Sequence, residues 1–476
     1  MINTSRNTLS ANWVLRFVPA DVWRFIFQIN SSAILSTLRV SQVCSSWRSI
    51  TDNAPELWTN IVLYYTREEG HVTPDADFFS YLLAKSRNMP LTMGLLASER
   101  IAFDGGNTAK VLEVFLRSMH RAQRLKLDID VLNDCLDQLD QIDHLMALVR
   151  PGLALEEIEI DVGDEALDDK RCLPSDVWKP APLLRALSMD GPAIAKGDLE
   201  TLHDASFPFQ QLTSLEVKCP IFDDGLILLL SLTPLLVQAK FHSIRRVKDD
   251  LDIQIQMLKL RSLTLGEPSY TEDSTRDTLP VTDILRYIAA PNLTTLRLSF
   301  NADWSLEILT SFIKASSRIQ NLHFDILNAT DTDRIECLKL LPSLRILNLS
   351  FTAGHERDFD ETSLIGRDFL DAMMERNVSS NQLVLCPNLE RLIVDYDTFA
   401  DTTTSAFADM IQRRWKHSAT DKEGKFELVI KEVGWLGDCP ESVSELHHLL
   451  LLRKTGLKLL IESKSSLEEI FDTDLL

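Results

Sequence analysis

The chain has 476 residues, of which 45% are hydrophobic and 25% charged, a balance typical of a soluble globular protein with core for two or three domains. The formal net charge is −21, and residues 1–70, with six Arg, no Lys and five acidic residues, contribute none of it. Because nucleic acid and anionic membranes are bound through clustered Lys and Arg, we expect neither as a partner. Two interpretations of the acidity stay open. It is either dispersed over a solvated surface, which is the simpler interpretation, or it serves to bind a basic partner.

No stretch has the pattern of a signal peptide or a membrane span. The first ten residues are polar, and residues 14–29 are interrupted by Arg16, Asp21 and Arg24. Seven cysteines, an odd number without a Cys-x-x-Cys pair, favour a reducing compartment and no zinc site. We therefore expect a cytoplasmic or nuclear protein without a metal or other cofactor.

Residues 17–58, FVPADVWRFIFQINSSAILSTLRVSQVCSSWRSITDNAPELW, are predicted to form three short helices. Pro19 suits the first turn of the first helix, because it lacks an amide hydrogen and its φ is fixed. Val22, Ile26 and Ile29 recur at spacings of four and three, which places them on one helix face.

Two further helices are predicted after this one, the first of them with Ser32 as its N-cap. The apolar residues of that second helix are Ile34, Leu35 and Leu38. Those of the third helix, which Ser41 would cap, are Val40, Val43, Cys44, Trp47 and Ile50. Pro55–Trp58 is expected to end the unit in a tight turn.

This helical stretch is too apolar for its size, since a unit of roughly 40 residues buries only a small core. Phe17, Val18, Trp23, Phe25 and Phe27 add apolar side chains around the first helix. Such an excess indicates a surface for another chain. The alternative is that the helices pack on the rest of this chain. Exposure of Trp23 and Phe25 would favour the first hypothesis, and their burial against the rest of the chain the second.

Three strings of residues in this stretch resemble the F-box. They are Val18-Pro19-x-Asp21-Val22-x-x-x-Ile26-Phe27, Leu38-x-Val40-Ser41-x-Val43-Cys44-x-x-Trp47-Arg48 and Pro55-x-Leu57-Trp58. In that family the motif docks the Skp adaptor (S-phase-kinase-associated protein) of a cullin–RING ubiquitin ligase, so the resemblance implies Skp and, through it, cullin as partners. The residues that it implies for adaptor binding are Val18, Pro19, Val22, Trp23, Ile26, Phe27, Leu35, Leu38, Val40, Val43, Cys44 and Trp47.

The next stretch is predicted to be a linker from Thr66 to Asp75, then a helix over residues 77–87 and a strand from Leu91 to Leu96. The string Tyr81-Leu82-Leu83-Ala84-Lys85-Ser86-x-x-x-Pro90-Leu91 resembles the segment that follows the F-box in a large family from mushroom-forming fungi.

A repeat of the form Leu-x-x-Leu-x-Leu dominates the rest of the chain. Its nine copies begin at Leu155, Leu184, Leu212, Leu236, Leu260, Leu293, Ile319, Leu344 and Leu389, with weaker copies at Leu125 and Phe426. Leu457-x-Leu459-x-Ile461, near the C-terminal end, alternates as a strand. Most spacings lie in or near the range of ~20–29 residues that leucine-rich repeats have. The segments between copies are apolar at helical spacing, over residues 224–232, 281–289, 306–315, 334–341 and 369–375.

This alternation predicts an α/β fold, a curved leucine-rich-repeat solenoid with parallel strands inside and helices outside. The resemblance described above implies that a small N-terminal helical F-box precedes it. The expected domains are residues 1–65 for the F-box, 66–120 for a linker and first strand–helix unit, and 121–476 for the solenoid with its C-terminal cap. In that cap, Ser442-x-x-Glu445 fits a capping box for a helix through Leu452, which Gly456 would close. Residues 266–278 and 353–362 are polar insertions, either recognition loops or passive excursions.

The chain carries none of the familiar catalytic or nucleotide-binding motifs, which favours a non-enzymatic protein. The acidic cluster Asp161, Asp164, Glu165, Asp168 and Asp169 does not match a calcium loop, so a solvated connection between repeats is the preferred interpretation. Arg413-Arg414-Trp415-Lys416-His417 is a small basic patch with one aromatic residue, and a helix face explains it better than RNA contact.

The resemblance to the F-box, together with the repeats, therefore implies the substrate-recognition subunit of a Skp–cullin–F-box (SCF) ubiquitin ligase, which would hold a protein substrate through its repeats. The competing hypothesis is a repeat scaffold whose N-terminal helices merely cap the solenoid. The substrate would contact exposed strand positions that alternate with the buried leucines, namely Glu216, Thr264, Thr295, Arg297, Arg345 and Asn348.

Overall fold

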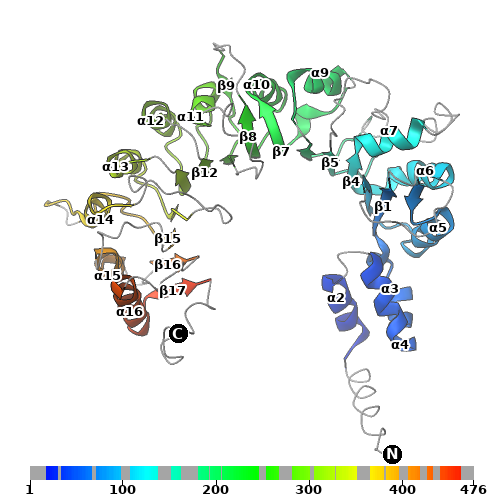
Figure 1. The fold of residues 1–476 in the computed structure, drawn as a ribbon, viewed down its shortest axis with the longest axis horizontal. Coiled ribbons are helices and arrows are strands. Elements are labelled where there is room, and N and C mark those ends of the chain that lie inside the picture. Colours follow the sequence, from blue (N-terminus) through cyan, green and yellow to red (C-terminus); the bar gives the residue numbers. More distant parts are fainter. Residues whose placement is uncertain are drawn as a thin grey trace, which may run out of the picture. The chain divides into compact units, whose positions relative to one another are not determined.

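The computed structural model places most of the residues that it describes in helices and strands (Figure 1). It describes residues 18–30, 34–66, 71–97, 108–137, 152–161, 179, 181–191, 193–204, 206–245, 253–266, 281–300, 305–326, 329–350, 365–379, 382–395, 406–418, 426–431 and 440–462. The chain divides into two compact units, with residues 1–192 and 197–212 in unit 1 and residues 193–196 and 213–476 in unit 2. The domain boundaries expected at residues 65 and 120 stay predictions.

Unit 1 begins with the helical module, which consists of α2 (Ala20–Asn30), α3 (Ile34–Val43), α4 (Ser45–Asp52) and the 3-10 turn η1 (Pro55–Trp58). Three helices and a closing turn were predicted here. The second helix boundary differs, because Val40 and Val43 belong to α3 rather than to the next helix.

The cap between α3 and α4 is Cys44, not Ser41. Cys44 has extended backbone geometry, with φ −158° and ψ 167°, and its Sγ accepts the amide hydrogen of Trp47 at 3.4 Å. Ser41 lies inside α3, where its hydroxyl donates to the Leu38 carbonyl at 2.7 Å. A serine within a helix commonly bonds to the preceding turn in this way, so its presence does not mark a helix start.

The sheet of unit 1 has the strand order β6-β5-β4-β3-β1-β2, and every described pairing is parallel except that of β1 with β2. Its strands are β1 (Asn60–Thr66), β2 (His71–Thr73), β3 (Leu91–Ala97), β4 (Ala122–Asp128), β5 (Glu157–Asp161) and β6 (Ala186–Asp190). Its helical segments are α5 (Ala76–Lys85), α6 (Thr108–Ser118), η2 (Met119–Arg121), α7 (Ile129–Asp137), α9 (Lys196–Asp204) and η4 (Phe209–Gln211). β1 and β2 were not predicted, since they occupy the end of the expected helical domain and part of the expected linker.

In unit 2 the strands lie along the inside of an arc, with helices outside (Figure 1). The strands are β7 (Ser214–Phe222), β8 (Gln238–Arg245), β10 (Ser262–Leu265), β12 (Thr295–Phe300), β13 (Asn321–Ile326), β14 (Ile346–Asn348), β15 (Arg391–Val394), β16 (Glu427–Ile430) and β17 (Lys458–Ile461), and they pair in parallel in this order. The helical segments are α10 (Asp223–Leu232), α11 (Val281–Ile284), η5 (Leu285–Tyr287), α12 (Leu306–Ala315), α13 (Asp331–Lys339), α14 (Arg367–Met374), α15 (Ala406–Ser418) and α16 (Pro440–Lys454). Two short strands, β9 (Ile255–Gln256) and β11 (Ile288–Ala289), pair separately.

The leucine-rich-repeat prediction is confirmed, because every predicted copy of the motif coincides with a strand. Second motif positions of neighbouring copies lie side by side in the ladder, and all are buried. In unit 2 they are Leu215, Ala239, Leu263, Leu296, Leu322, Leu347, Leu392 and Leu428, and Leu459 of the predicted last strand continues the row. Burying one such leucine contributes about 1.5–3 kcal/mol, and each does so only against its neighbours.

Two details of the predicted helices differ. The helix expected over residues 281–289 stops after Ile284, because Ile288–Ala289 pairs with β9 instead. α16 begins at Pro440, two residues before Ser442, so Ser442 is not its N-cap. The helix ends at Lys454, two residues after the predicted Leu452, and Gly456 follows it as predicted, with a φ of 113° that suits a residue without a side chain.

Candidate functional site

Three aromatic rings form the interior of the helical module. The Trp23 ring centroid lies 5.8 Å from that of Phe27 and 5.1 Å from that of Trp47, and Phe27 and Trp47 are 5.0 Å apart. Phe27 is only 4% exposed. Because α2 contributes Trp23 and Phe27 and α4 contributes Trp47, this cluster fixes which face of α2 points inward.

The opposite face of α2 is apolar and exposed. Val22, Phe25, Ile26 and Ile29, hereafter the α2 stripe, retain 45%, 63%, 37% and 67% of their accessible surface. Their spacing of three, four and seven residues places them along one line of the helix. Such a row normally faces a core. Here it faces outward among the described residues, as a surface for a protein partner does.

Val43 at the end of α3 is a further exposed apolar residue of the module, at 61%. Other members of the sequence-predicted adaptor site are distributed differently. Pro19 is exposed, Val18, Leu38, Val40 and Cys44 are half-buried, and Trp23, Phe27 and Trp47 form the aromatic interior. The side chain of Leu35 lies outside the described residues. The predicted list thus combines surface and interior residues, and it omits Phe25 and Ile29, which the helical spacing from Val22 could have identified.

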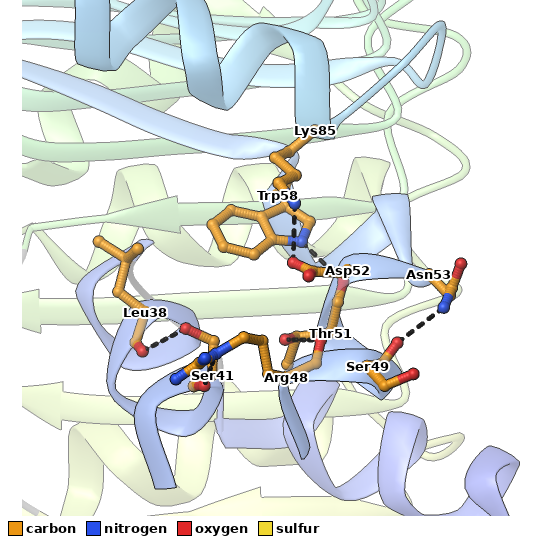
Figure 2. Close-up of polar contacts among 9 residues, drawn as sticks. All are labelled: Leu38, Ser41, Arg48, Ser49, Thr51, Asp52, Asn53, Trp58 and Lys85. Carbon is orange, nitrogen blue, oxygen red and sulfur yellow. Dashed lines mark hydrogen bonds and ion pairs between the residues drawn. The ribbon is translucent and has the colours of Figure 1, made fainter. Parts of the chain in front are cut away.

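A polar and aromatic junction fixes the module to the first repeat (Figure 2). Lys85, at the end of α5, reaches Asp52 at the end of α4 with 2.7 Å between Nζ and Oδ1. The same ammonium lies 5.9 Å from the ring centroid of Trp58 and 5.3 Å from that of Tyr81, within the range of a cation–π contact. The hydrogen bond to Asp52 is the main reason that the pKa of Lys85 is raised.

Hydrogen bonds to backbone carbonyls stiffen the helical module itself. The buried indole of Trp58 donates from Nε1 to the Thr51 carbonyl at 2.9 Å, and the Thr37 hydroxyl donates to the Leu57 carbonyl at 3.0 Å. The Arg48 Nε donates to the Ser41 carbonyl at 3.1 Å, which connects α4 to α3 (Figure 2). The exposed stripe is therefore carried by a helical unit fixed to the sheet of unit 1, not by a freely hinged one.

The two residues chosen to distinguish docking from capping behave differently. Phe25 is exposed, as the docking hypothesis requires. Trp23 is half-buried, but it packs within the module rather than against the repeats. Trp58, by contrast, is 1% exposed, and its ring meets that of Tyr81 of α5 at 6.1 Å between centroids. One end of the module thus covers the first repeat while the α2 stripe stays open.

A second candidate surface is the inner strand face of unit 2. One row of this face runs through neighbouring strands in register, as Glu216, Lys240, Thr264, Arg297, His323 and Asn348. Four of these are predicted substrate-binding residues; of the other two, Lys240 is half-buried and His323 is buried at 9%. Aligning the repeats by their leucines would have placed Lys240 and His323 in the same row, because they occupy the same motif position as the other four residues. The expectation that Thr264 is exposed was wrong, because this residue retains only 8% of its accessible surface.

The remaining two predicted substrate residues lie outside this row. Thr295 occupies the neighbouring row, where its hydroxyl accepts from the Asn321 amide at 3.3 Å. Arg345 is not on a strand, because it precedes β14 and its guanidinium pairs with Glu390 at 2.7 Å. It belongs to the turns where the strands begin, so its assignment to the strand face was wrong.

The row is held together by contacts across the strands. Glu216 Oε1 lies 3.4 Å from both Lys240 Nζ and His242 Nε2. His323 Nε2 lies 3.0 Å from the Ser350 carbonyl, which fixes its ring. A face with both signs of charge and ordered side chains suits recognition of a mixed polar surface on another protein.

Three aspartates occupy another row, in unit 1. Asp128, Asp161 and Asp190 lie side by side on β4, β5 and β6. Burial, followed by the charges of Asp128 and Asp190, raises the pKa of Asp161. In the part of the chain that the structure describes, no group of three His, Cys, Asp or Glu is placed to hold a metal ion. The other members of the predicted acidic cluster, and nearly all of the two predicted insertions, lie outside the described residues.

The predicted basic patch near Trp415 is a face of α15, but not a continuous one. Arg414 is 3% exposed and donates to the carbonyls of Met373, Leu385 and Cys386 at 3.0, 2.6 and 3.1 Å. Desolvation lowers the pKa of this guanidinium to about 10. Its neighbour Arg413 is exposed, so the two arginines have separate roles.

Comparison with known proteins gives structures of low similarity. No protein-family model matches the chain, and no curated protein matches it. The leucine-rich repeat-containing protein LegL7 from Legionella pneumophila is 12% identical, with a TM-score of 0.34 over 71% of this chain and 93% of that one. Rad7, in its complex with Elc1 from yeast, is 12% identical, with a TM-score of 0.33 over 91% of this chain and 94% of that one. A chain of the TLR13–ssRNA13 complex is 13% identical, with a TM-score of 0.27 over 77% of this chain and 55% of that one. At such scores the fold assignment rests on this chain's own strands and registers.

Among the described helices, none combines the length and the apolar character that crossing a bilayer requires.

Proposed function

We propose that this chain is the substrate-recognition subunit of an SCF ubiquitin ligase, in which the helical module binds the Skp adaptor and the repeats bind a protein substrate. The observation that carries the proposal is the exposed α2 stripe, within the stretch whose residues resemble the F-box. A helix with aromatic residues buried on one side and apolar residues exposed on the other has a second, unfilled packing face.

The stripe supplies enough apolar surface for specific binding. Each exposed Val, Ile or Phe side chain contributes about 1.5–3 kcal/mol when it is fully buried, although part of that free energy offsets the loss of motion on association. Phe25 is the side chain of the stripe that can contribute most to the binding free energy, because aromatic residues dominate the energetics of interfaces. Val22, Ile26 and Ile29 flank it on the same line and would exclude water from its surroundings.

The role of the repeats would be to hold the substrate close to the ubiquitin-charged partner. A receptor that holds a substrate near a ubiquitin-charged partner raises the effective concentration of the reacting groups and supplies no acid, base or nucleophile. The surface proposed for the substrate consists of the half-buried positions of the inner row, namely Glu216, Lys240, Arg297 and Asn348, so that Lys240 is added to the sequence-based set. The junction of Lys85 with Asp52 supports this role, because a module fixed to unit 1 carries the adaptor at a constant position on that unit.

The second candidate function is a repeat scaffold capped by its helical module. Burial of Trp58 beside Tyr81 favours capping of the first repeat. Capping does not use the α2 stripe, whereas adaptor binding requires it. The two functions are therefore distinguished by whether the stripe binds a partner.

The test is binding of the full-length chain to a purified Skp adaptor, measured by co-purification and titration. Phe25→Asp combined with Ile29→Asp is expected to abolish binding, while circular dichroism and thermal unfolding stay unchanged because both positions are exposed. Val378→Asp, at a fully exposed residue of unit 2, is the matched control and should bind like the wild type. Failure of the folded wild-type chain to bind would refute the ligase function and leave the scaffold.

A further inference from the structure

The two outermost strands of the described sheets end differently. In unit 1 the outer edge of β1 is covered by β2, a strand of three residues that returns antiparallel to it. In unit 2 the last strand is β17, which pairs with β16 on one side. Among the residues that the structure describes, no strand pairs with its other side. An edge of this kind is a template for another strand, and natural proteins usually cover or charge it.

The backbone groups available at that edge can be identified from the existing ladder. The Glu462 amide donates to the Ile430 carbonyl of β16 at 3.0 Å. Because backbone groups alternate in direction along a strand, those of Lys458 and Leu460 also point to β16, and those of Leu459 and Ile461 point to the open edge.

The side chains on the inner face of this edge are complementary to themselves. Lys458, Leu460 and Glu462 are exposed, and Leu459 and Ile461 point into the core. In an antiparallel pair centred on Leu460, the leucine meets its own copy, Lys458 lies opposite Glu462, and Leu459 exchanges both hydrogen bonds with Ile461. The register that matches the charges is thus also the register that pairs the free backbone groups.

From this self-complementarity we infer that the open edge of β17 pairs with β17 of a second copy of this chain, forming a symmetric dimer. A two-fold axis through Leu460 makes the contact isologous, so it closes at two chains. The charge of Lys458 would disfavour pairing with a strand that has no acidic residue at the opposite position. In the proposed dimer, Glu462 of the second copy occupies that position. Since β17 has four residues, we expect a weak dimer whose population depends on concentration. This inference is independent of the proposed ligase function.

A charge exchange tests the register directly. The mass of the full-length chain is measured by sedimentation equilibrium over a range of concentrations, for the wild type, Lys458→Glu, Glu462→Lys and the double variant. The wild type and the double variant are expected to dimerise, because each places opposite charges across the axis. Either single variant places like charges there and should fall to the monomer mass.

Mixing the two single variants gives the decisive result. One then carries two acidic and the other two basic side chains at these positions, so the mixture should recover the dimer mass that neither variant shows alone. A wild type that stays monomeric at every concentration would overturn the inference, as would dimers that are unaffected by either single change. A chain that dimerises only after removal of residues 463–476 would also overturn it, since that segment would then occupy the edge.

Discussion

Lys85 and Asp52, which are 33 residues apart in sequence, join two helices with 2.7 Å between the ammonium nitrogen and a carboxylate oxygen. The contact connects the end of α4 to the end of α5 beside the buried ring of Trp58. It therefore couples the helical module to the repeat that follows.

Lys85→Met is predicted to lower the free energy of unfolding by about 0.5 kcal/mol at neutral pH, since the aliphatic stem is kept and mainly the charge contacts are lost. The pKa of Lys85 is raised above its ordinary value of 10.5, so the stabilisation is complete below that pH and disappears as pH rises through the folded-state pKa. Urea unfolding of both proteins at neutral and strongly alkaline pH should show a difference that vanishes at the alkaline end. Lys110→Met, which removes the exposed pair with Asp77, is the control and should change little at either pH.

Arg414→Met is predicted to destabilise unit 2 by about 3 kcal/mol or more, because three buried carbonyls lose their donor at once. Arg414→Lys should recover only part of this loss, since an ammonium cannot reproduce the planar fork of a guanidinium. Thermal unfolding measures the effect, and Arg413→Met at the exposed neighbouring position is the matched control. Equal effects at the two positions would contradict the role assigned to Arg414.

Gly366→Ala is predicted to destabilise the protein by about 1–3 kcal/mol, the range for a side chain inserted where there is no room. A Cβ atom there would lie 2.7 Å from Asp331 Oδ2, which accepts the Phe369 amide at 3.0 Å and so caps α14 from the neighbouring helix. The effect should shrink in an Asp331→Ala background, and a double-mutant cycle measures that coupling. Gly197→Ala, with open space around the new Cβ, should be neutral or stabilising.

Asp161→Asn is predicted to stabilise unit 1 at neutral pH, because it removes a carboxylate whose charged form is disfavoured by burial and by two neighbouring aspartates. The pKa of Asp161 is raised above 3.8, so the native state binds this proton more tightly and the penalty develops as pH rises through the folded-state pKa. Chemical unfolding at a series of pH values should show a gain that shrinks as pH falls toward 3.8. Asp204→Asn, at an exposed position on α9, should show no such pH dependence.

The strands were predictable because the repeat fixes both their location and their buried face. A leucine at every second position of a strand, repeated at a near-constant interval, leaves few other ways to bury so many apolar side chains. The α2 stripe was partly predictable for the same reason, since Val22, Ile26 and Ile29 follow the helical period. Which side of α2 faces the interior was not, because Trp23 and Phe27 compete with the stripe for that role and the outcome depends on Trp47 of a different helix.

The sequence did not indicate the role of Arg414, the strand β1 or the cap of α4. Arg414 looked like part of a basic patch, and only the three carbonyls around it show that it is an interior residue. β1 was missed because Asn60–Thr66 follows directly on the helical module and carries no complete copy of the repeat motif. Cys44 replaced Ser41 as a cap because capping depends on backbone conformation, which residue type only biases.

The burial of Trp58 has a consequence for how the protein can be divided. The aromatic ring that closes the helical module is also part of the core shared with α5, and β1 begins two residues after it. Cutting the chain after the module would expose this ring and remove its neighbours, so α2 is presented correctly only when the first repeat has folded. A partner that binds the α2 stripe would therefore bind chains in which the first repeat has folded. It would not bind incompletely folded chains.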